Sequence, residues 1–332
     1  MTIRPFPEIE DVHPIVMPLP GSDLLTLNLY AVGPGPVTLI DAGLKLPWWV
    51  DFIRSSLRSR GLDLGDIERI IFTHGHMDHF GLAMSIREAA GRDIPCFIHE
   101  EDRWRIASET FEEEMWTEEM EYFMATAGLP ETEIRKVRDR FSFLRELCDP
   151  LDDASVMRDG DVFEGDGYHL TVIHTPGHTT GMSCLYEARR KILFSGDHII
   201  KHITPNPLME IKRSRLPDPN YQSLRTFMES LDRLKSLDVR LVFPGHGEYM
   251  DNLHEIIDGY FVHHRERMDL VWQALKKESR PLYQLIDDVF PYVPDGDAFL
   301  AISELLVHLE ILVGEGRAEL ADPGPPVLYR AL

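Results

Sequence analysis

The sequence predicts an α/β fold, because apolar segments of strand length alternate with amphipathic segments of helix length through most of the chain. The alternation is clearest between residues 67 and 98, where two apolar stretches flank a segment with helical periodicity. A second observation is that polar turns containing histidine or aspartate follow several apolar stretches. The chain has 332 residues, 43% of them hydrophobic, which suits one large domain and a smaller one, or two of moderate size.

The first hundred residues predict short strands followed by this alternating unit. The apolar stretches nearest the N-terminus are separated by glycine and proline, which is typical of an antiparallel sheet. A helical pattern that ends at Gly61 follows them. The expected strands are 12–19, 24–32, 36–40, 67–72 and 94–98, and the expected helices are 48–60 and 82–90.

The pattern changes between about residues 100 and 148, where two acidic amphipathic helices are separated by the sequence Gly128-Leu129-Pro130. This segment interrupts the strand pattern, so we interpret it as a helical insertion. Beyond it, the expected strands are 161–163, 168–174, 183–187, 191–195 and 240–243, and the expected helix is 221–236.

The C-terminal part is mostly helical and ends in two short strand-like stretches. Three helices and a hairpin within about seventy residues are the outline of a small winged-helix module. We therefore predict a large domain at 1–265 that includes the insertion 100–148, and a winged-helix-like domain at 266–332. The expected helices are about 252–277, 282–290 and 298–313, and the expected strands are 317–320 and 327–330.

Composition and charge argue against several classes of binding partner. The formal net charge of −22 repels polyanions and anionic membranes, so nucleic acid is not an expected partner. No run of eighteen apolar residues appears, and the N-terminus lacks the apolar segment of an export signal. Cys96, Cys148 and Cys184 are too far apart for a thiolate metal site or a redox pair. We expect a cytoplasmic protein, with reduced thiols, that acts on a small molecule and not at a membrane.

Four ligand-type side chains follow the expected strand 67–72 within six positions: His74, His76, Asp78 and His79. Neutral imidazole and carboxylate are the groups that zinc- and iron-class ions bind. His74 and His76 point the same way only in extended or loop geometry, where side chains repeat at period two. The cluster therefore indicates a metal site at the end of a strand.

Three later strand ends each carry one more ligand-type side chain after a turn of small residues. Such turns let the backbone approach closely and hold the ligand still. The three are His178 within 175–179, Asp197 within 194–198 and His246 within 243–247.

These motifs and their order resemble the metallo-β-lactamase superfamily over roughly residues 12 to 265. The resemblance implies an α/β fold of the αβ/βα four-layer sandwich type and a site for two metal ions. It assigns His74, His76 and His178 to one ion, Asp78, His79 and His246 to the second, and Asp197 to a bridge between them. Asp41 matches the early aspartate of the family, which orients a ligand histidine. The alternative for Asp41 is an ordinary turn aspartate before Gly43.

The expected chemistry follows from two divalent ions. Zinc is the expected metal, and iron or manganese suits the same ligands. Two such ions activate a shared water as a metal-bridging hydroxide, so hydrolysis is the default reaction. Asp78 is the candidate to orient that water or accept its proton. Redox chemistry is disfavoured, because diiron relatives carry glutamate in place of His76 and mononuclear iron relatives use only the first ligand group.

The remaining histidines carry weaker signals. His198 and His202 lie close to Asp197 in sequence and are candidates for substrate contact, although a packing role is the stronger alternative. His263 and His264 lie on an expected helix and are expected at the surface or at an interface. His308 shows no functional signal.

The insertion 100–148 is rich in aromatic and methionine side chains. Above the metal site they would form a cap with an apolar wall, which suits a small acyl ester, a thioester of the hydroxyacylglutathione type or a lactone. Ordinary helix packing or a homodimer face explains the same pattern equally well. The residues are Trp104, Phe111, Met115, Trp116, Tyr122, Phe123, Met124, Phe141 and Phe143.

The tail and residues 203–207 resemble a subgroup of lactamase-like proteins, some of which cleave single-stranded RNA. A metal-dependent endoribonuclease or other phosphodiesterase is therefore the alternative function. The tail, however, contains more acidic than basic residues, whereas a surface that follows a phosphate backbone is basic. We therefore favour carbonyl over phosphoryl substrates.

Overall fold

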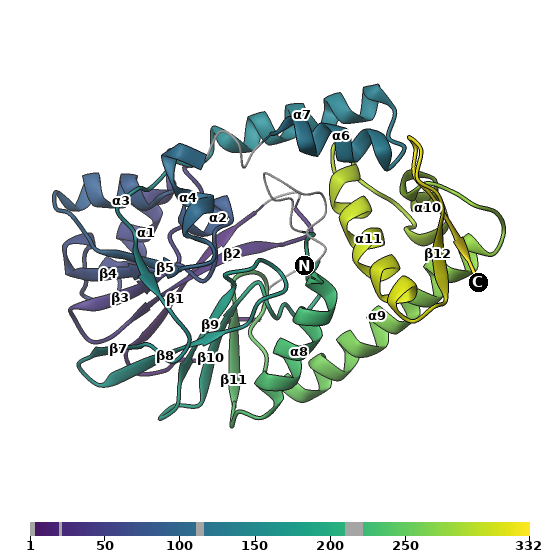
Figure 1. Cartoon of the computed structure of the whole chain (residues 1–332). Helices are drawn as coiled ribbons and strands as arrows, with labels where there is room; N and C mark the ends of the chain where they lie inside the picture. Colours follow the sequence, from purple (N-terminus) through teal and green to yellow (C-terminus); the bar gives the residue numbers. More distant parts are fainter. Residues whose placement is uncertain (1–3, 20–21, 111–115, 210–221) are drawn as a thin grey trace.

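The structure of the protein is a computed structural model that describes residues 4–19, 22–110, 116–209 and 222–332. These residues form a six-stranded sheet, a five-stranded sheet, a two-stranded hairpin and helices that flank them (Figure 1). The predicted α/β class is confirmed.

The six-stranded sheet has the order β1-β2-β3-β4-β5-β6. Its first three strands pair antiparallel, and β3 to β6 pair in parallel. Only one of the three residues of β6 is buried, so no apolar pattern marked this strand in the sequence. The strands are β1 Val12–Pro18, β2 Thr26–Val32, β3 Val37–Ile40, β4 Ile67–Ile71, β5 Cys96–His99 and β6 Ser155–Met157.

The five-stranded sheet has the order β11-β10-β9-β8-β7. Its strands pair antiparallel except for β10 and β11, which are parallel. Each strand predicted between residues 161 and 243 is found here. The strands are β7 Val162–Gly165, β8 Tyr168–His174, β9 Ser183–Glu187, β10 Ile192–Gly196 and β11 Leu241–Pro244.

Alternate residues of these strands enter two different cores. In β10, Ile192 and Phe194 join a core shared with residues of the six-stranded sheet, whereas Leu193 faces the opposite side. In β11, Phe243 joins the shared core and Val242 the opposite one. Because side chains alternate across a strand, a strand buried on both faces is apolar throughout. The two sheets therefore pack face to face, and their outer faces are also covered.

Helices cover the outer faces of both sheets. Apolar residues of α1 Trp49–Arg58 and α3 Ala83–Ala90 pack on the six-stranded sheet. Those of α8 Ser223–Lys235 and α9 Leu253–Leu275 pack on the five-stranded sheet. The first residue of the predicted helix 221–236 lies outside the described residues. The short helices near the strand ends are η1 Leu64–Asp66, α2 Met77–Phe80 and α4 Arg103–Ile106.

The insertion packs against the C-terminal helices. Its helices α6 Glu118–Thr126 and α7 Glu131–Arg145 extend toward the C-terminal helices (Figure 1) and share one apolar cluster with them. Phe123 and Met124 are buried in this cluster, whereas Tyr122 and Phe143 are exposed. Ordinary helix packing thus accounts for part of the aromatic pattern, and the role as a cap stays a prediction. Phe111 and Met115 of that pattern lie outside the described residues.

The C-terminal part contains the predicted sequence of helices and strands. The elements are α10 Leu282–Val289, α11 Ala298–Gly314, β12 Ala318–Asp322 and β13 Leu328–Ala331. Helix α9 is continuous from residue 253 to residue 275, so the boundary predicted at 265/266 lies inside a helix that both parts share. The winged-helix-like assignment and the division into two domains stay predictions.

Among the described residues, no helix is both long enough and apolar enough to cross a membrane. The cytoplasmic location and the homodimer stay predictions of the sequence.

The sequence prediction for His264 was wrong. Its side chain is 1% exposed, and its Nδ1 lies 3.1 Å from Nε2 of His308 on α11. His308 donates from Nδ1 to the carbonyl oxygen of Glu304, so its Nε2 accepts from His264. The ring of His264 also contacts Phe227 of α8. It is buried because α9 crosses both neighbouring helices at this point, which the sequence of α9 alone did not reveal.

The shared cluster predicts that the insertion contributes to global stability. Met124 is fully buried there, so Met124→Ala should lower the free energy of unfolding by about 2 to 5 kcal/mol. Tyr122→Ala in the same helix is the control: that side chain is 66% exposed, and the expected change is within about 0.5 kcal/mol. Urea unfolding followed by circular dichroism measures both. Equal effects would contradict a common core.

The His264–His308 pair predicts a dependence of stability on pH. Burial, with a smaller effect of neighbouring positive groups, lowers the pKa of His264 to about 2, and burial lowers that of His308 to about 3. In the unfolded chain both pKa values are about 6.5. Between the folded and unfolded pKa values, the unfolded state therefore binds more protons than the folded state. The contribution of the two neutral rings to the free energy of unfolding is complete above pH 6.5 and is lost as the pH falls.

Replacing one ring should weaken that dependence. Between about pH 6.5 and pH 4, the unfolding free energy of His308→Gln should fall less steeply than that of wild type, by up to about 1.4 kcal/mol per pH unit. The control is His254→Gln, because His254 is an exposed residue of α9, the helix that also carries His264. Parallel curves for wild type and His308→Gln would contradict the expectation.

Candidate metal centre

The predicted site residues come together where strand ends of the two sheets meet. His74 and His76 lie in the turn after β4, and Asp78 and His79 lie in the short helix α2. The turns after β8, β10 and β11 carry the other three side chains, His178, Asp197 and His246. Because β8, β10 and β11 run in the same direction, these three turns lie at one edge of the five-stranded sheet.

The first group consists of His74, His76 and His178. Nδ1 of His76 lies 2.9 Å from Nε2 of His74 and 3.1 Å from Nε2 of His178. All three ligand atoms lie within 4.8 Å of one another, as the binding of a single ion requires.

The second group consists of Asp78, His79 and His246. The carboxylate of Asp78 lies 3.8 Å from Nε2 of His79 and 3.3 Å from Nε2 of His246. These ligand atoms also lie within 4.8 Å of one another. These three side chains thus form a second group of ligand-type atoms beside the first.

Asp197 lies between the two groups. Its Oδ1 is 3.4 Å from Nε2 of His79, and its Oδ2 is 3.3 Å from Nε2 of His246. The same Oδ2 is 3.7 Å from Nε2 of His178, which belongs to the first group. One carboxylate thus approaches ligand atoms of both groups.

Unpartnered polar atoms show that this cluster suits a metal. Nε2 of His79, Nε2 of His246 and Oδ1 of Asp197 are buried and have no hydrogen-bond partner among the described residues. Buried polar atoms are normally paired, so an orphaned set that converges on one point suits a bound cation. Gly245 adds to this, because a Cβ there would lie 2.5 Å from Oδ1 of Asp197 and 2.8 Å from Cε1 of His79.

Hydrogen bonds on the far side of the rings fix their orientation. Nδ1 of His79 donates to Oδ2 of Asp41, Nδ1 of His178 to the carbonyl oxygen of Asn206, and Nδ1 of His246 to that of Thr26. The Nε2 atom of each ring is therefore left to face the cluster. Asp41 contacts a ligand-type histidine at the predicted place, and its role in orienting a metal ligand stays a prediction.

The cluster couples the protonation of its members. Burial lowers the pKa of His246, but the carboxylates of Asp197 and Asp78 outweigh burial and raise it to about 10. Burial also lowers the pKa of His79, and Asp197 and neighbouring carboxylates raise it well above its ordinary value. For Asp197, burial raises the pKa, yet the charges of His246 and His79 hold it well below its ordinary value. Protons on two histidines thus supply positive charge that a metal would replace.

His76 behaves differently from the two proton-binding histidines. Burial and then the charge of His178 lower the pKa of His76 to about 3. The ring is therefore neutral near pH 7, as a metal ligand must be.

The two candidates for substrate contact are placed elsewhere. The side chain of His198 is fully buried against the ring of Phe227, with a centroid distance of 4.7 Å. His202 is exposed, and its Nε2 donates to the carbonyl oxygen of Asp23 at 2.8 Å. Burial of His198 argues for a packing role, and substrate contact by His202 stays a prediction.

The sequence did not indicate a role for Asp102 or Arg105. Both lie near the turns that carry the first group, and Asp102 accepts a hydrogen bond from the backbone N–H of Gly75. The only signal in the sequence was the position of Asp102 just beyond a predicted strand, at the same sheet edge as the ligand turns.

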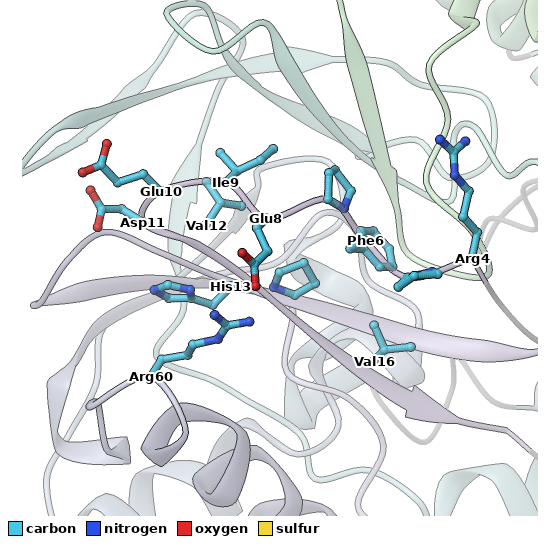
Figure 2. A pocket seen from close by; sticks show the side chains of 13 residues that line it. Arg4, Phe6, Glu8, Ile9, Glu10, Asp11, Val12, His13, Val16 and Arg60 are labelled. Atoms are coloured by element: carbon cyan, nitrogen blue, oxygen red, sulfur yellow. The ribbon is translucent and has the colours of Figure 1, made fainter.

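A pocket of about 570 Å³ lies away from this cluster. It is lined by residues of the N-terminal segment and of β1, together with Arg60 (Figure 2). Its charges are mixed, since Arg4 and Arg60 line it together with Glu8 and Asp11. None of the seven ligand-type residues lines it, so the candidate centre is the cluster at the strand ends.

Comparison with known proteins agrees with this site. Residues 24–246 match the metallo-beta-lactamase superfamily. The probable metallo-hydrolase YqjP of Bacillus subtilis is 27% identical in an alignment 330 residues long that covers 97% of this chain and 98% of that protein. The atrochrysone carboxyl ACP thioesterase dmxR1 of Cryptosporiopsis sp. is 23% identical in an alignment 282 residues long that covers 83% of this chain and 67% of that protein.

A solved structure is similar over the whole chain. The metallo-beta-lactamase family protein TTHA1429 from Thermus thermophilus has a TM-score of 0.79 and 27% identity, covering 98% of this chain and 99% of that one. The family match includes all seven ligand-type residues and most of the chain. The chain therefore belongs to the metallo-beta-lactamase superfamily and is a metal-dependent hydrolase of that superfamily.

Proposed function

We propose that the chain is a dinuclear hydrolase of a small acyl thioester, ester or lactone. His74, His76 and His178 would hold one divalent ion, and Asp78, His79 and His246 the other. The observation that carries this proposal is the position of Asp197, whose carboxylate lies within 3.7 Å of Nε2 atoms from both groups. A bridging carboxylate is what two adjacent cations need, because it offsets charge on both.

The proposed metal is zinc, which is bound well by imidazole and carboxylate; iron and manganese are the alternatives. When bound, a pair of such ions polarises a carbonyl oxygen and lowers the pKa of water.

The chain's own residues would orient the reaction. The side chain of Asp78 is 24% exposed, whereas that of Asp197 is 9% exposed. Asp78 is therefore the carboxylate of the cluster that a water molecule from solvent reaches more readily, and we assign it the role of orienting that water and accepting its proton.

Two observations support a carbonyl substrate. The relative dmxR1 is named an ACP thioesterase, and a thioester is a carbonyl substrate. The cations of the C-terminal part are also largely neutralised by ion pairs within the fold. Lys277 and Arg280 contact Asp288, Arg317 contacts Asp269, and Arg330 contacts Glu319. Such a surface does not favour a phosphate backbone, so an endoribonuclease is the less supported alternative.

Loss of ligands should abolish activity and metal binding together. His76→Ala should lose the ion of the first group, and Asp197→Ala should bind both ions more weakly. Elemental analysis should give two ions per wild-type chain and fewer in each variant, and circular dichroism should show that the fold is retained. His169→Ala is the control, because His169 is an exposed residue that pairs with Glu164 on β7. Activity that survives complete removal of metal by a chelator would refute the proposal.

A substrate panel separates carbonyl from phosphoryl chemistry. We expect kcat/KM values for an acyl thioester or a lactone to exceed the value for bis-nitrophenyl phosphate by at least about a hundredfold, a difference in barrier of about 2.7 kcal/mol. The assay uses the zinc-loaded protein and repeats each rate with the iron- and manganese-loaded forms. A preference for the phosphodiester, or RNA binding at physiological salt, would favour the endoribonuclease instead.

A further inference from the structure

Asp102 is a buried carboxylate without an assigned role. It follows β5 and directly precedes α4, and its side chain is fully buried. Burying a carboxylate is costly unless hydrogen bonds or opposite charges compensate. Its surroundings therefore reveal what it holds in place.

The hydrogen bonds of Asp102 reach two separate turns. Oδ2 accepts from the backbone N–H of Gly75 at 2.8 Å and from the hydroxyl of Thr179 at 2.6 Å. Oδ1 accepts from the backbone N–H of Gly181 at 2.8 Å and from Nε of Arg105 at 3.2 Å. A longer bond of 3.4 Å joins Oδ1 to the hydroxyl of Thr180.

These two turns carry all three histidines of the first group. Gly75 lies between His74 and His76 in the turn after β4, and Thr179 directly follows His178 in the turn after β8. The two strands belong to different sheets. Through Asp102, the turn from one sheet is hydrogen-bonded to the turn from the other at the point where their ligand atoms converge.

The backbone packs closely against Asp102 and Arg105 at two glycines. A Cβ at Gly181 would lie 2.6 Å from Cβ and Cγ of Asp102, and a Cβ at Gly75 would lie 2.9 Å from Cβ and Cδ of Arg105. Burial raises the pKa of Asp102, but Arg105, Thr179 and the two backbone N–H groups outweigh burial and lower it. The group is therefore an ionised acceptor, and ionised acceptors form the stronger hydrogen bonds.

Asp41 forms the corresponding contacts for the second group. Its carboxylate accepts from the backbone N–H of Thr73 at 2.8 Å and from Nδ1 of His79 at 2.8 Å. Within the described part of the chain, Asp102 forms no hydrogen bond with a ligand ring, and its bonds instead hold the backbone that carries the rings.

We propose that Asp102 is a positioning residue that sets the affinity of the His74, His76 and His178 group for its metal ion. The inference rests on the proposed dinuclear site, because it assigns Asp102 to one of its two halves. Removing such a partner typically lowers metal affinity by about 10- to 100-fold.

The test measures binding of Zn²⁺ alone to the full chain after removal of metal. Asp102→Asn keeps the size of the side chain but replaces one acceptor oxygen with an NH2 group, which faces the N–H and O–H donors that now bind the carboxylate. Competition with a chromogenic chelator should show a loss of about 10- to 100-fold for one ion and a clearly smaller change for the other. The visible absorption of the Co²⁺ form should change as well, because it reports ligand geometry.

Two controls separate positioning from general stability. Asp63→Asn removes a similar set of contacts at the start of η1, where Asp63 accepts from Leu64 and Arg58, and should bind both ions as wild type does. In a His76→Ala background, Asp102→Asn should cause no further loss for the ion that remains, since both changes act on the same group. If Asp102→Asn lowered the affinity for both ions equally, and still lowered it in the His76→Ala background, the role of Asp102 would be purely structural.

A second pair of variants covers the case in which Asp102→Asn does not fold. Thr179→Val removes the hydroxyl that donates to Asp102, and Thr179→Ser keeps it. The valine variant should bind one ion more weakly, and the serine variant should restore most of that affinity. Wild-type affinity in Thr179→Val or in folded Asp102→Asn overturns the inference. If the wild-type chain binds only one ion, the dinuclear proposal fails instead.

Discussion

The site depends on the face-to-face packing of the two sheets, because neither group of ligand-type side chains comes from one sheet alone. Tyr30 of β2 packs its ring against Phe194 and Phe243 of the other sheet, at centroid distances of 5.1 and 5.4 Å. Its hydroxyl donates to the carbonyl oxygen of Pro244 at 2.6 Å, just before His246. The apolar core thus determines how far apart the ligand turns lie.

Backbone hydrogen bonds then fix the turns at that distance. The N–H of Asn28 donates to the carbonyl oxygen of Gly245 at 2.7 Å, and the N–H of Ser183 donates to that of Thr73 at 2.9 Å. Both bonds join one sheet to the other beside the cluster. These hydrogen bonds hold the turns that carry the charged side chains, so the buried charges can lie close together. Ligands that are held in place in this way lose little freedom when a cation binds. The same rigidity explains why orphaned nitrogen and oxygen atoms persist at the centre.

The C-terminal part is connected to this site by the segment after Asp197. Nδ1 of His178 donates to the carbonyl oxygen of Asn206, whose side-chain nitrogen donates to the carbonyl oxygen of Leu300 on α11. The N–H of Met209 donates to the hydroxyl of Ser303 on the same helix. Because the insertion packs on this helical group, the insertion and the tail support one ligand histidine from outside the sheets.

The sequence by itself determined the α/β class, most of the strands and the seven side chains that the structure brings together, because periodicity and local motifs are properties of neighbouring positions. It missed β6, which is too short to show a period, and misplaced His264, whose partner His308 is 44 positions away. It also could not identify Asp102, since a single aspartate beyond a strand resembles any turn residue. Only the tertiary structure decided which turns this carboxylate joins and that the insertion packs on the tail, because such contacts depend on how the sheets and helices pack in space and not on local sequence.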